Sequence, residues 1–248
     1  MTHEPEPLIS GDDVLVGIDD TDTVESEYGT GKISRLLGGH LDDQISELNW
    51  QGSVRQQLLV DPRVPYTTHN SSATLVCEVP STVMRQKIVE IAAAFVEDIA
   101  ADGSDPGLCV GRTRKVGQAA QEFGVDAGET LVTEQRAYDV ARETGLFLNE
   151  YGGTGEGVIG ALAGVGRTST GDRGRFVGYS DIRSYSGDVS VSELRSGGIL
   201  VALSGGELIE SGTVDTGGWV RPLLRGGRPV LKVRELADGR YRALNLDN

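Results

Sequence analysis

The spacing of apolar residues predicts alternating strands and helices in the first part of the chain. A β-branched apolar run at residues 14–18 predicts a buried strand that ends at an aspartate. Apolar residues three and four positions apart predict helices at 32–48 and 83–101. The other elements predicted here are strands at 53–60, 72–79, 108–110 and 146–148, and helices at 112–123, 133–143 and 158–165.

Beyond residue 170 the pattern changes to short apolar runs separated by glycine and serine. The change predicts an α/β unit followed by an α+β unit. We place these units at residues 1–130 and 131–248, with a boundary anywhere from 125 to 151 and a chain that can cross between them more than once. The strands predicted in this last part are 175–179, 199–204, 208–214, 219–224 and 229–235.

The composition is that of a globular protein of 248 residues, with 38% hydrophobic and 24% charged residues. No apolar run approaches the roughly 18 residues that a membrane span needs. The acidic start MTHEPEPLISGDD has neither the basic nor the apolar segment of a secretory signal. Two cysteines without a CxxC spacing and three scattered histidines argue against structural zinc. We therefore expect a cytoplasmic protein without a membrane partner.

The net charge of −14 argues against a broad electropositive surface for nucleic acid. Very few of the basic residues are lysine, and nearly all others are arginine. An acidic chain poor in lysine is typical of halophilic proteins. We therefore attribute the negative net charge first to adaptation to a salty environment and only then to function. The scarcity of lysine makes Lys32 more informative than a lysine would be elsewhere.

Three aspartates, Asp19, Asp20 and Asp22, follow the first predicted strand within four residues. Two carboxylates about 6 Å apart repel by roughly 3 kcal/mol at an effective dielectric constant near 20, so this group calls for a partner. Mg²⁺ binds carboxylate oxygens and keeps positions for water and phosphate. The aspartates therefore predict a metal site that bridges to a nucleotide. A solvated turn whose Asp and Thr side chains cap the next turn is the alternative.

The segment GTGKIS begins the next predicted helix with Gly29, Gly31 and Lys32. Two glycines let backbone amides converge on an anion, the positive end of the helix faces that anion, and the lysine adds a charge. The segment is not a Walker A motif, which needs glycine at position 26 and a hydroxyl at position 33. We predict that these residues and Thr21 bind the cofactor. The alternative is a glycine-containing helix start with an exposed lysine.

A second glycine-rich segment, GGTGEGVIG, contains a GxGxxG pattern at Gly155, Gly157 and Gly160. A strand ending at 179 and an acid at 181 follow, which loosely matches a dinucleotide fingerprint. The apolar run before the glycines is short, so this signal is weak. We include these three glycines among the cofactor-binding residues, as an anion-binding helix start, and the close packing of a small-residue helix remains an equally open alternative.

Taken in order, the segments VGIDDTDT, GTGK, DPRVPYTTHNSSATLVCEV and GGTGEGVIGALAGVG resemble the archaeal tRNA(Ile) agmatinylcytidine synthetases and their shorter relatives. The resemblance covers residues 14–179. It implies a kinase-like α/β N-terminal domain that binds ATP and Mg²⁺ at the DDTD loop, followed by a ferredoxin-like domain with the second glycine motif. It also implies that Asp19, Asp20 and Asp22 are metal and phosphate ligands. The family uses ATP to activate C2 of a cytidine, whose oxygen agmatine then replaces.

The sequence departs from that family in two places. Full-length members have a cysteine followed by threonines, one of them autophosphorylated, where this chain has Gly31, Lys32 and Ile33. We therefore expect Lys32 to neutralise phosphate directly, without a covalent protein intermediate. Full-length members also continue into an OB-fold and a zinc ribbon that hold the tRNA. We expect a short relative without these modules, which makes tRNA a less expected substrate.

Three hypotheses for the function follow. The first is a Mg²⁺- and ATP-dependent enzyme that activates an oxygen of a nucleoside or small molecule by phosphoryl or adenylyl transfer, with Asp19, Asp20, Asp22 and Lys32 at the phosphates. The second is a non-catalytic nucleotide or ligand sensor on the same fold. The third, ranked well below, is an NAD(P)-dependent oxidoreductase that uses residues 155–160. The acceptor and a homo-oligomeric state are left open.

Overall fold

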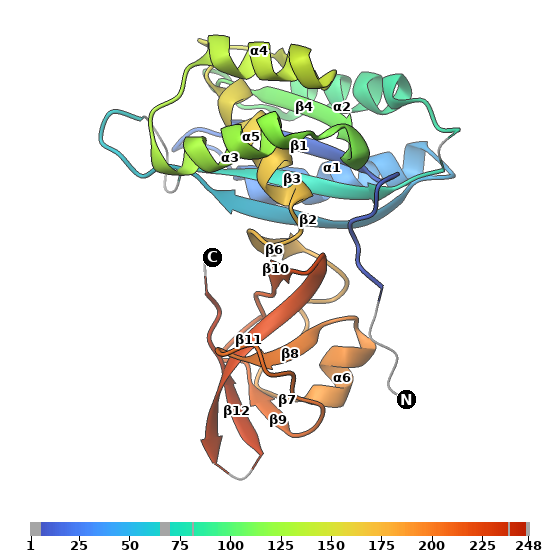
Figure 1. The fold of residues 1–248 in the computed structure, drawn as a ribbon, viewed down its shortest axis with the longest axis vertical. Coiled ribbons are helices and arrows are strands. Elements are labelled where there is room, and N and C mark those ends of the chain that lie inside the picture. The colour runs from blue at the N-terminus through green and yellow to red at the C-terminus, as the bar shows by residue number, and fades with distance from the viewer. Residues whose placement is uncertain (1–5, 65–69, 81, 238, 247–248) are drawn as a thin grey trace.

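The computed structural model describes residues 6–64, 70–80, 82–237 and 239–246. Figure 1 shows two bodies joined at a narrow waist, a layered upper body and a smaller, strand-rich lower body. One 12-stranded sheet runs through both in the order β5-β4-β1-β3-β2-β6-β10-β11-β12-β9-β7, with β8 paired to β11. Within the described ranges, no helix is both long and apolar enough to cross a membrane.

The upper body begins with a β-α-β-β-α-β unit. Its elements are β1 (Val14–Asp19), α1 (Thr30–Gln44), β2 (Asn49–Gln57), β3 (Ser71–Glu78), α2 (Arg85–Ile99) and β4 (Gly107–Arg112). The strands lie in the order β4-β1-β3-β2, and every neighbouring pair is antiparallel. This is the split β-α-β arrangement of ferredoxin-like folds. The prediction that placed a ferredoxin-like unit in residues 131–248 is therefore wrong in position.

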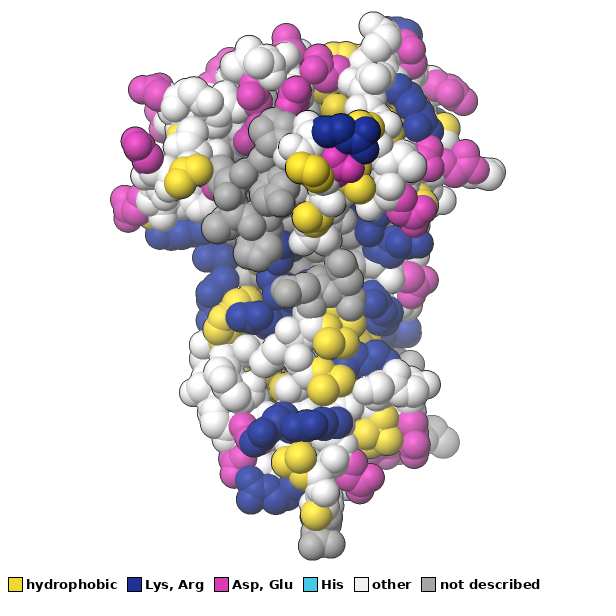
Figure 2. All heavy atoms as spheres, turned by 90° about the vertical axis from the view of Figure 1, so that its left-hand side faces the viewer, with side chains coloured by type: hydrophobic (Ala, Val, Ile, Leu, Met, Phe, Trp, Pro, Cys, Tyr) yellow, Lys and Arg dark blue, Asp and Glu magenta, His cyan; other side chains and the backbone are white. Residues whose placement is uncertain are grey.

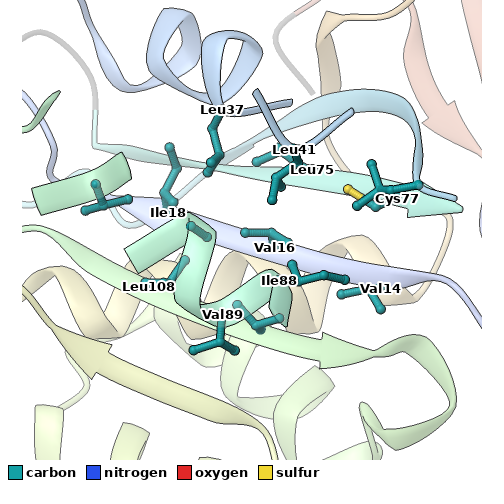
Figure 3. Packing of buried hydrophobic residues seen from close by; sticks show 14 of the residues in the cluster. Val14, Val16, Ile18, Leu37, Leu41, Leu75, Cys77, Ile88, Val89 and Leu108 are labelled. Atoms are coloured by element: carbon teal, nitrogen blue, oxygen red, sulfur yellow. The ribbon is translucent and has the colours of Figure 1, made fainter. Parts of the chain in front are cut away.

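Helices cover both faces of this sheet. On one face α1 and α2 pack over alternate residues of β1, as Figure 3 shows for Val16, Leu37 and Ile88. The other face carries α3 (Gln118–Glu129), α4 (Glu134–Thr144) and α5 (Gly157–Ser169). There Leu15 packs in one buried cluster with Phe123 of α3. The two-residue period of a strand thus sends successive side chains of β1 into two separate cores.

The second core joins residues from both sides of position 130. Leu162 of α5 lies in the same cluster as Leu15 and Phe123, so α5 completes the upper body. The edge strand β5 (Phe147–Glu150) pairs with β4, also in the upper body. After α5 the chain passes into the lower body through β6 (Arg175–Gly178), which pairs with both β2 and β10.

The lower body has a further buried cluster, which runs from Phe176 to Val233 and also includes Val54 of β2. Its elements are β7 (Asp188–Ser190), α6 (Val191–Ser196), β8 (Leu200–Leu203), β9 (Thr213–Asp215), β10 (Leu223–Arg225), β11 (Arg228–Ala237) and β12 (Arg240–Ala243). The N-terminal segment is tied to this body, because the backbone NH of Leu8 donates to the carbonyl of Gly227 at 2.8 Å.

Most predicted elements are present, and three differ. The predicted helix 112–123 is wrong in its first half, where the short 3-10 helix η1 (Thr113–Lys115) ends before α3 starts at residue 118. The predicted strand 208–214 is reduced to β9 at its end, because Gly212 has a φ of +118°, a conformation outside the β region. The predicted strand 219–224 is reduced to β10, which starts at Leu223. The pattern gave no signal for β7, α6 or β12.

Candidate functional site

Two sequence motifs more than a hundred residues apart meet in one cavity. The C-terminal end of β1, the first turn of α1 and the N-terminal turn of α5 form its acidic side. Of the predicted site residues, five line the cavity: Asp19, Asp20, Asp22, Gly157 and Gly160. The remaining lining residues are Thr30, Leu58, Leu59, Val64, Asn70, Ala127, Thr130, Leu131, Val132, Glu156 and Ile159.

Glycines bring the two motifs together. A side-chain carbon at Gly17 in β1 would overlap the backbone carbonyl of Ala161 in α5. One at Gly160 would overlap the carboxylate of Asp19. Only hydrogen at these two positions lets α5 lie directly on β1. The glycine motif therefore serves close packing, and that packing also brings the start of α5 to the aspartates.

Asp22 holds the start of α1. Its Oδ1 accepts hydrogen bonds from the backbone NH of Thr30 at 2.9 Å and from the Thr30 hydroxyl at 2.7 Å. Thr21 is buried, and its hydroxyl donates to that of Thr30 at 3.2 Å. Gly29 is the N-cap residue and offers no side-chain acceptor, so Asp22 takes over that function. The capping alternative considered for the DDTD turn describes Asp22 correctly.

Asp19 and Asp20 are in a strongly acidic environment. Burial raises the pKa of Asp19 to about 8, and the charges of Asp20 and Asp22 add to this increase. Burial likewise raises the pKa of Asp20 to about 6, with further contributions from the charges of Asp105, Asp22 and Glu156. Two carboxylates that resist ionisation side by side favour a cation as a partner.

The chemistry of these oxygens fits a hard divalent cation held together with a substrate. Within the described ranges, no three acidic, histidine or cysteine side chains form a group that could hold a metal by themselves. The predicted set of three aspartate ligands is therefore not preformed, and one oxygen of Asp22 already bonds Thr30. Mg²⁺ commonly uses one or two carboxylates and completes its shell with water and phosphate. Asp19 and Asp20 fit that smaller set.

The glycine-rich turn before α5 is anchored by Asp105, which was not predicted as part of the site. Its Oδ1 accepts hydrogen bonds from the backbone NH groups of Thr154 and Gly155. Gly155 has a φ of +91°, a conformation that favours glycine. Asp105 thus fixes the turn that leads into α5, next to Asp20, whose pKa it helps to raise. The sequence signal was only an aspartate before Pro–Gly.

The dinucleotide interpretation of the GxGxxG pattern is wrong. A dinucleotide fold needs parallel neighbouring strands on either side of the glycine-rich turn and its helix. Here β5 and β6 flank α5 in sequence but lie on opposite sides of the β4-β1-β3-β2 unit. β5 is antiparallel to β4, and β6 is antiparallel to β2. The third hypothesis, an NAD(P)-dependent oxidoreductase, therefore has no supporting fold.

The cavity also has apolar lining residues, which the sequence analysis missed. Leu58 and Leu59 follow β2, Leu131 and Val132 come from the connection between α3 and α4, and Ile159 belongs to α5. These residues are scattered in sequence, so no local pattern joins them. A cavity lined by both apolar side chains and carboxylates suits a ligand with an apolar part and a charged part.

Lys32, Gly31 and Gly29 lie beside this cavity and do not line it. The Nζ atom of Lys32 stands 3.4 Å from the centroid of the Tyr28 ring. The carbonyl of Gly31 accepts a hydrogen bond from the Arg35 guanidinium at 2.9 Å. Gly155 likewise does not line the cavity, although it belongs to the turn that Asp105 holds.

Comparison with known proteins identifies one relative by sequence. The chain is 27% identical over 171 residues to the tRNA 2-agmatinylcytidine synthetase TiaS of Cenarchaeum symbiosum (strain A), with 64% of this chain and 34% of the relative covered. No family model matches the chain. This chain thus spans about a third of the length of the curated relative that it matches.

Solved structures agree in fold. The complex of TiaS with its isoleucine tRNA and ATP matches with a TM-score of 0.53 at 21% identity, covering 62% of this chain and 36% of that one. A tRNA fluorescent labeling enzyme matches with a TM-score of 0.51 at 23% identity over the same shares. The resemblance to the agmatinylcytidine synthetases is confirmed, and the chain shares the mixed α/β core of TiaS.

Proposed function

We propose that this chain is an ATP-dependent enzyme that activates an oxygen of a nucleoside or small molecule by phosphoryl or adenylyl transfer. One observation carries the proposal: the acidic end of β1 and the glycine-rich start of α5 meet in a single cavity that also has apolar lining residues. A nucleoside triphosphate combines a flat base with a polyanion, and the lining offers partners for both parts.

We assign some of these residues to the phosphates of the nucleotide and others to its base. Asp19 and Asp20 would hold Mg²⁺, which supplies neutralisation of the phosphate charge when it is bound. The first turn of α5 lines the same cavity, and the N-terminus of a helix of this length favours an anion. Ile159 and Leu131 would pack on the base. Asp105 keeps the turn before α5 in place.

Lys32 is proposed as a further phosphate ligand. It lies two residues after Thr30, which lines the cavity, and its long side chain rests on Tyr28. To reach a phosphate it has to leave that ring, a contact worth about 0.5–1 kcal/mol at an exposed position. A charged phosphate offers more than that, because charge-assisted hydrogen bonds are about twice as strong as neutral ones.

The relatives support the nucleotide and leave the acceptor open. One TiaS structure is a complex with tRNA and ATP, and another contains AMPCPP and agmatine. The acceptor of this chain is proposed only as an oxygen on a nucleoside or small molecule, with tRNA one candidate. We also propose that the boundary between the two units lies near residue 178 instead of 130, because α4, β5 and α5 belong to the upper body.

Calorimetric titration with Mg-ATP, in the salt at which the protein is stable, tests the site. Asp19→Asn combined with Asp20→Asn should abolish measurable binding, and Asp139→Asn, an exposed residue of α4 paired with Arg142, should leave it unchanged. Equal affinity of both variants would overturn the assignment.

Chromatography of the nucleotide product then separates AMP, expected for a synthetase-like reaction, from ADP, expected for a kinase. Tight binding without turnover of ATP, against a panel of amines and nucleosides, would favour the non-catalytic sensor.

A further inference from the structure

A second cavity lies at the waist of the molecule. It has a volume of about 450 Å³ and is formed by α1, β2 and the segment that follows β6. Its lining residues are Arg35, Trp50, Gly178, Tyr179, Ser180, Asp181, Ile182, Arg183 and Ser184. This volume is in the range of pockets that hold small molecules. None of the residues assigned to the proposed nucleotide site lines it.

Two arginines of this cavity converge on a single backbone oxygen. The guanidinium of Arg35 donates to the carbonyl of Val177 at 3.3 Å, and that of Arg183 donates to the same carbonyl at 3.4 Å. Burial lowers the pKa of Arg35, and the neighbouring charge of Arg183 lowers it further. Asp181 is the one carboxylate among the described residues that line the cavity, and it balances only one of these two positive charges.

A third arginine stands next to them on a shared tryptophan. The Arg183 guanidinium lies 4.4 Å from the centroid of the Trp219 ring, and that of Arg221 lies 4.9 Å from it. The buried Nε of Arg221 has no hydrogen-bond partner among the described residues. The cavity and the adjoining Trp219 therefore gather three positive charges, and one N–H donor there, the Nε of Arg221, is without a partner among the described residues.

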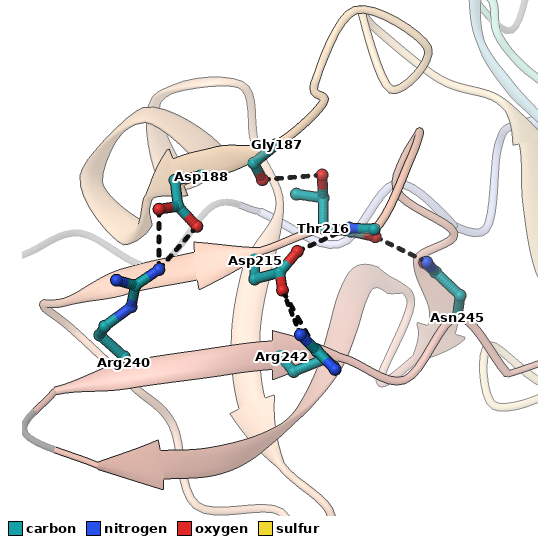
Figure 4. A network of polar contacts seen from close by, with 8 residues as sticks. Gly187, Asp188, Asp215, Thr216, Arg240, Arg242 and Asn245 are labelled. Carbon is teal, nitrogen blue, oxygen red and sulfur yellow. Dashed lines mark hydrogen bonds and ion pairs between the residues drawn. The ribbon is translucent and has the colours of Figure 1, made fainter.

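This arrangement is unlike that of the arginines farther down the lower body. Figure 4 shows Arg240 paired with Asp188 and Arg242 paired with Asp215, at 2.8 and 2.6 Å. Within the described ranges, neither Arg35 nor Arg183 has such a carboxylate partner. On the face that Figure 2 shows, Lys and Arg side chains also gather at the waist, whereas the upper body is rich in Asp and Glu. In a chain with a net charge of −14, such unpaired arginines indicate an anionic ligand.

We propose that this cavity binds a small phosphate monoester with a ring, held by Arg35 and Arg183. Arg35, Arg183 and the neighbouring Arg221 carry three positive charges, of which Asp181 balances one. A phosphate monoester carries close to two negative charges at neutral pH and neutralises the remaining two, whereas a carboxylate neutralises one of them. The planar forks of arginine match phosphate oxygens in a bidentate manner. Trp50 and Tyr179 supply aromatic walls for the ring.

The two cavities lie close together along α1. Thr30 lines the first and Arg35 the second, and five residues of a helix span about 7.5 Å. The phosphate site stands on its own contacts and does not depend on the proposed nucleotide site. Its position near that site makes it suited to hold a phosphorylated substrate or effector.

Tryptophan fluorescence provides a direct test, because the chain has only two tryptophans, Trp50 in the cavity and Trp219 beneath Arg183. The probe is phenyl phosphate, titrated in chloride at constant ionic strength with EDTA, which removes the metal on which the nucleotide site depends. We expect saturable quenching. Arg183→Gln should reduce the affinity for phenyl phosphate at least tenfold, and Arg35→Gln should reduce it by a similar factor. Arg240→Gln should bind like the wild type, because Arg240 lies in the lower body and is paired with Asp188.

Two further probes identify what the cavity recognises. Benzoate has the same ring with a single charge and should bind at least tenfold more weakly than phenyl phosphate. A 12-nucleotide single-stranded RNA should not compete with phenyl phosphate at equal phosphate concentration. Absence of quenching, equal affinity of Arg183→Gln and Arg240→Gln, equal binding of benzoate, or binding of the RNA without binding of phenyl phosphate would each overturn the proposal. Mg-ATP titration of Arg183→Gln should remain normal, which separates this site from the nucleotide site.

Discussion

Gly160 in α5 packs directly against the carboxylate of Asp19 at the end of β1. The contact joins the two motifs of the chain, since one belongs to the DDTD turn and the other to the second glycine-rich segment. It also helps to bury Asp19, whose pKa rises mainly through desolvation. The packing of one helix on one strand therefore shapes both the geometry and the charge of the candidate site.

Gly160→Ala should damage the site more than it damages the fold. The added methyl group overlaps the Asp19 carboxylate, so Asp19 has to move or α5 has to lift from β1. Overpacking of this kind costs about 1–3 kcal/mol. We expect Mg-ATP affinity to fall at least tenfold in calorimetry, with a melting temperature lower by several degrees.

Gly39→Ala in α1 is the matched control. A side-chain carbon at position 39 has no neighbour within 4 Å, and alanine is favoured over glycine within a helix by about 1 kcal/mol. This variant should melt slightly higher than the wild type and bind Mg-ATP equally well. If Gly160→Ala binds as tightly as Gly39→Ala, the contact with Asp19 has no functional importance.

Asp105→Ala should release the glycine-rich turn. The carboxylate accepts two backbone hydrogen bonds there, and hydrogen bonds to a charged group contribute roughly 1.5–3 kcal/mol each. We expect faster amide exchange at Thr154 and Gly155 and weaker Mg-ATP binding. Asp105→Asn retains an acceptor oxygen and should lie between the wild type and Asp105→Ala in both measurements. Unchanged exchange in Asp105→Ala would contradict the anchoring role.

The elements of the upper body were largely predictable, because each has a strong local pattern. The run at residues 14–18 became β1 (Val14–Asp19), and the helical face predicted at 83–101 became α2 (Arg85–Ile99). β1 is a central strand of the sheet and is buried on both faces, and α2 buries one apolar face on the sheet, so hydrophobic spacing alone identifies both segments. In the lower body several strands have only three or four residues, too few to show a period.

The composition of the site was predictable only in part. Asp19, Asp20 and Asp22 stand out because they cluster in sequence. Asp105 and Leu131 reach the site through the pairing of β4 with β5 and the packing of α3 and α4. Such contacts depend on sheet order, which apolar spacing does not encode. The ferredoxin-like unit was placed in the wrong half for the same reason, because strand order defines it.

Lys32→Gln should distinguish a phosphate ligand from a surface lysine. The side chain is exposed and rests on Tyr28, so its loss should leave the melting temperature within about one degree of the wild type, as surface substitutions usually do. If Lys32 reaches a phosphate, calorimetry should show Mg-ATP affinity reduced several-fold. Tyr28→Leu removes the competing ring and should leave that affinity equal or slightly higher. Normal affinity in Lys32→Gln would remove this residue from the site.

Without divalent cations, the protein should lose stability as the pH rises. Asp19 and Asp20 start from an ordinary pKa of 3.8, and the folded protein raises these values to about 8 and about 6. Between about pH 4 and pH 8, the folded state therefore binds more protons than the unfolded state. The stabilisation is complete below about pH 4 and is lost as the pH passes through 6 and then 8.

Thermal melts in EDTA from pH 4.5 to pH 9 measure this loss. The net charge of −14 adds a background slope that Asp19→Asn shares, because the variant differs at one carboxyl group. Asparagine does not ionise, so the variant should melt higher than the wild type at pH 8.5 and show a flatter decline. Mg²⁺ should raise the melting temperature of the wild type most at high pH, where both carboxylates are ionised, and should have little effect on the variant. Parallel curves for the two proteins would show that Asp19 ionises normally and that burial at the end of β1 does not control its charge.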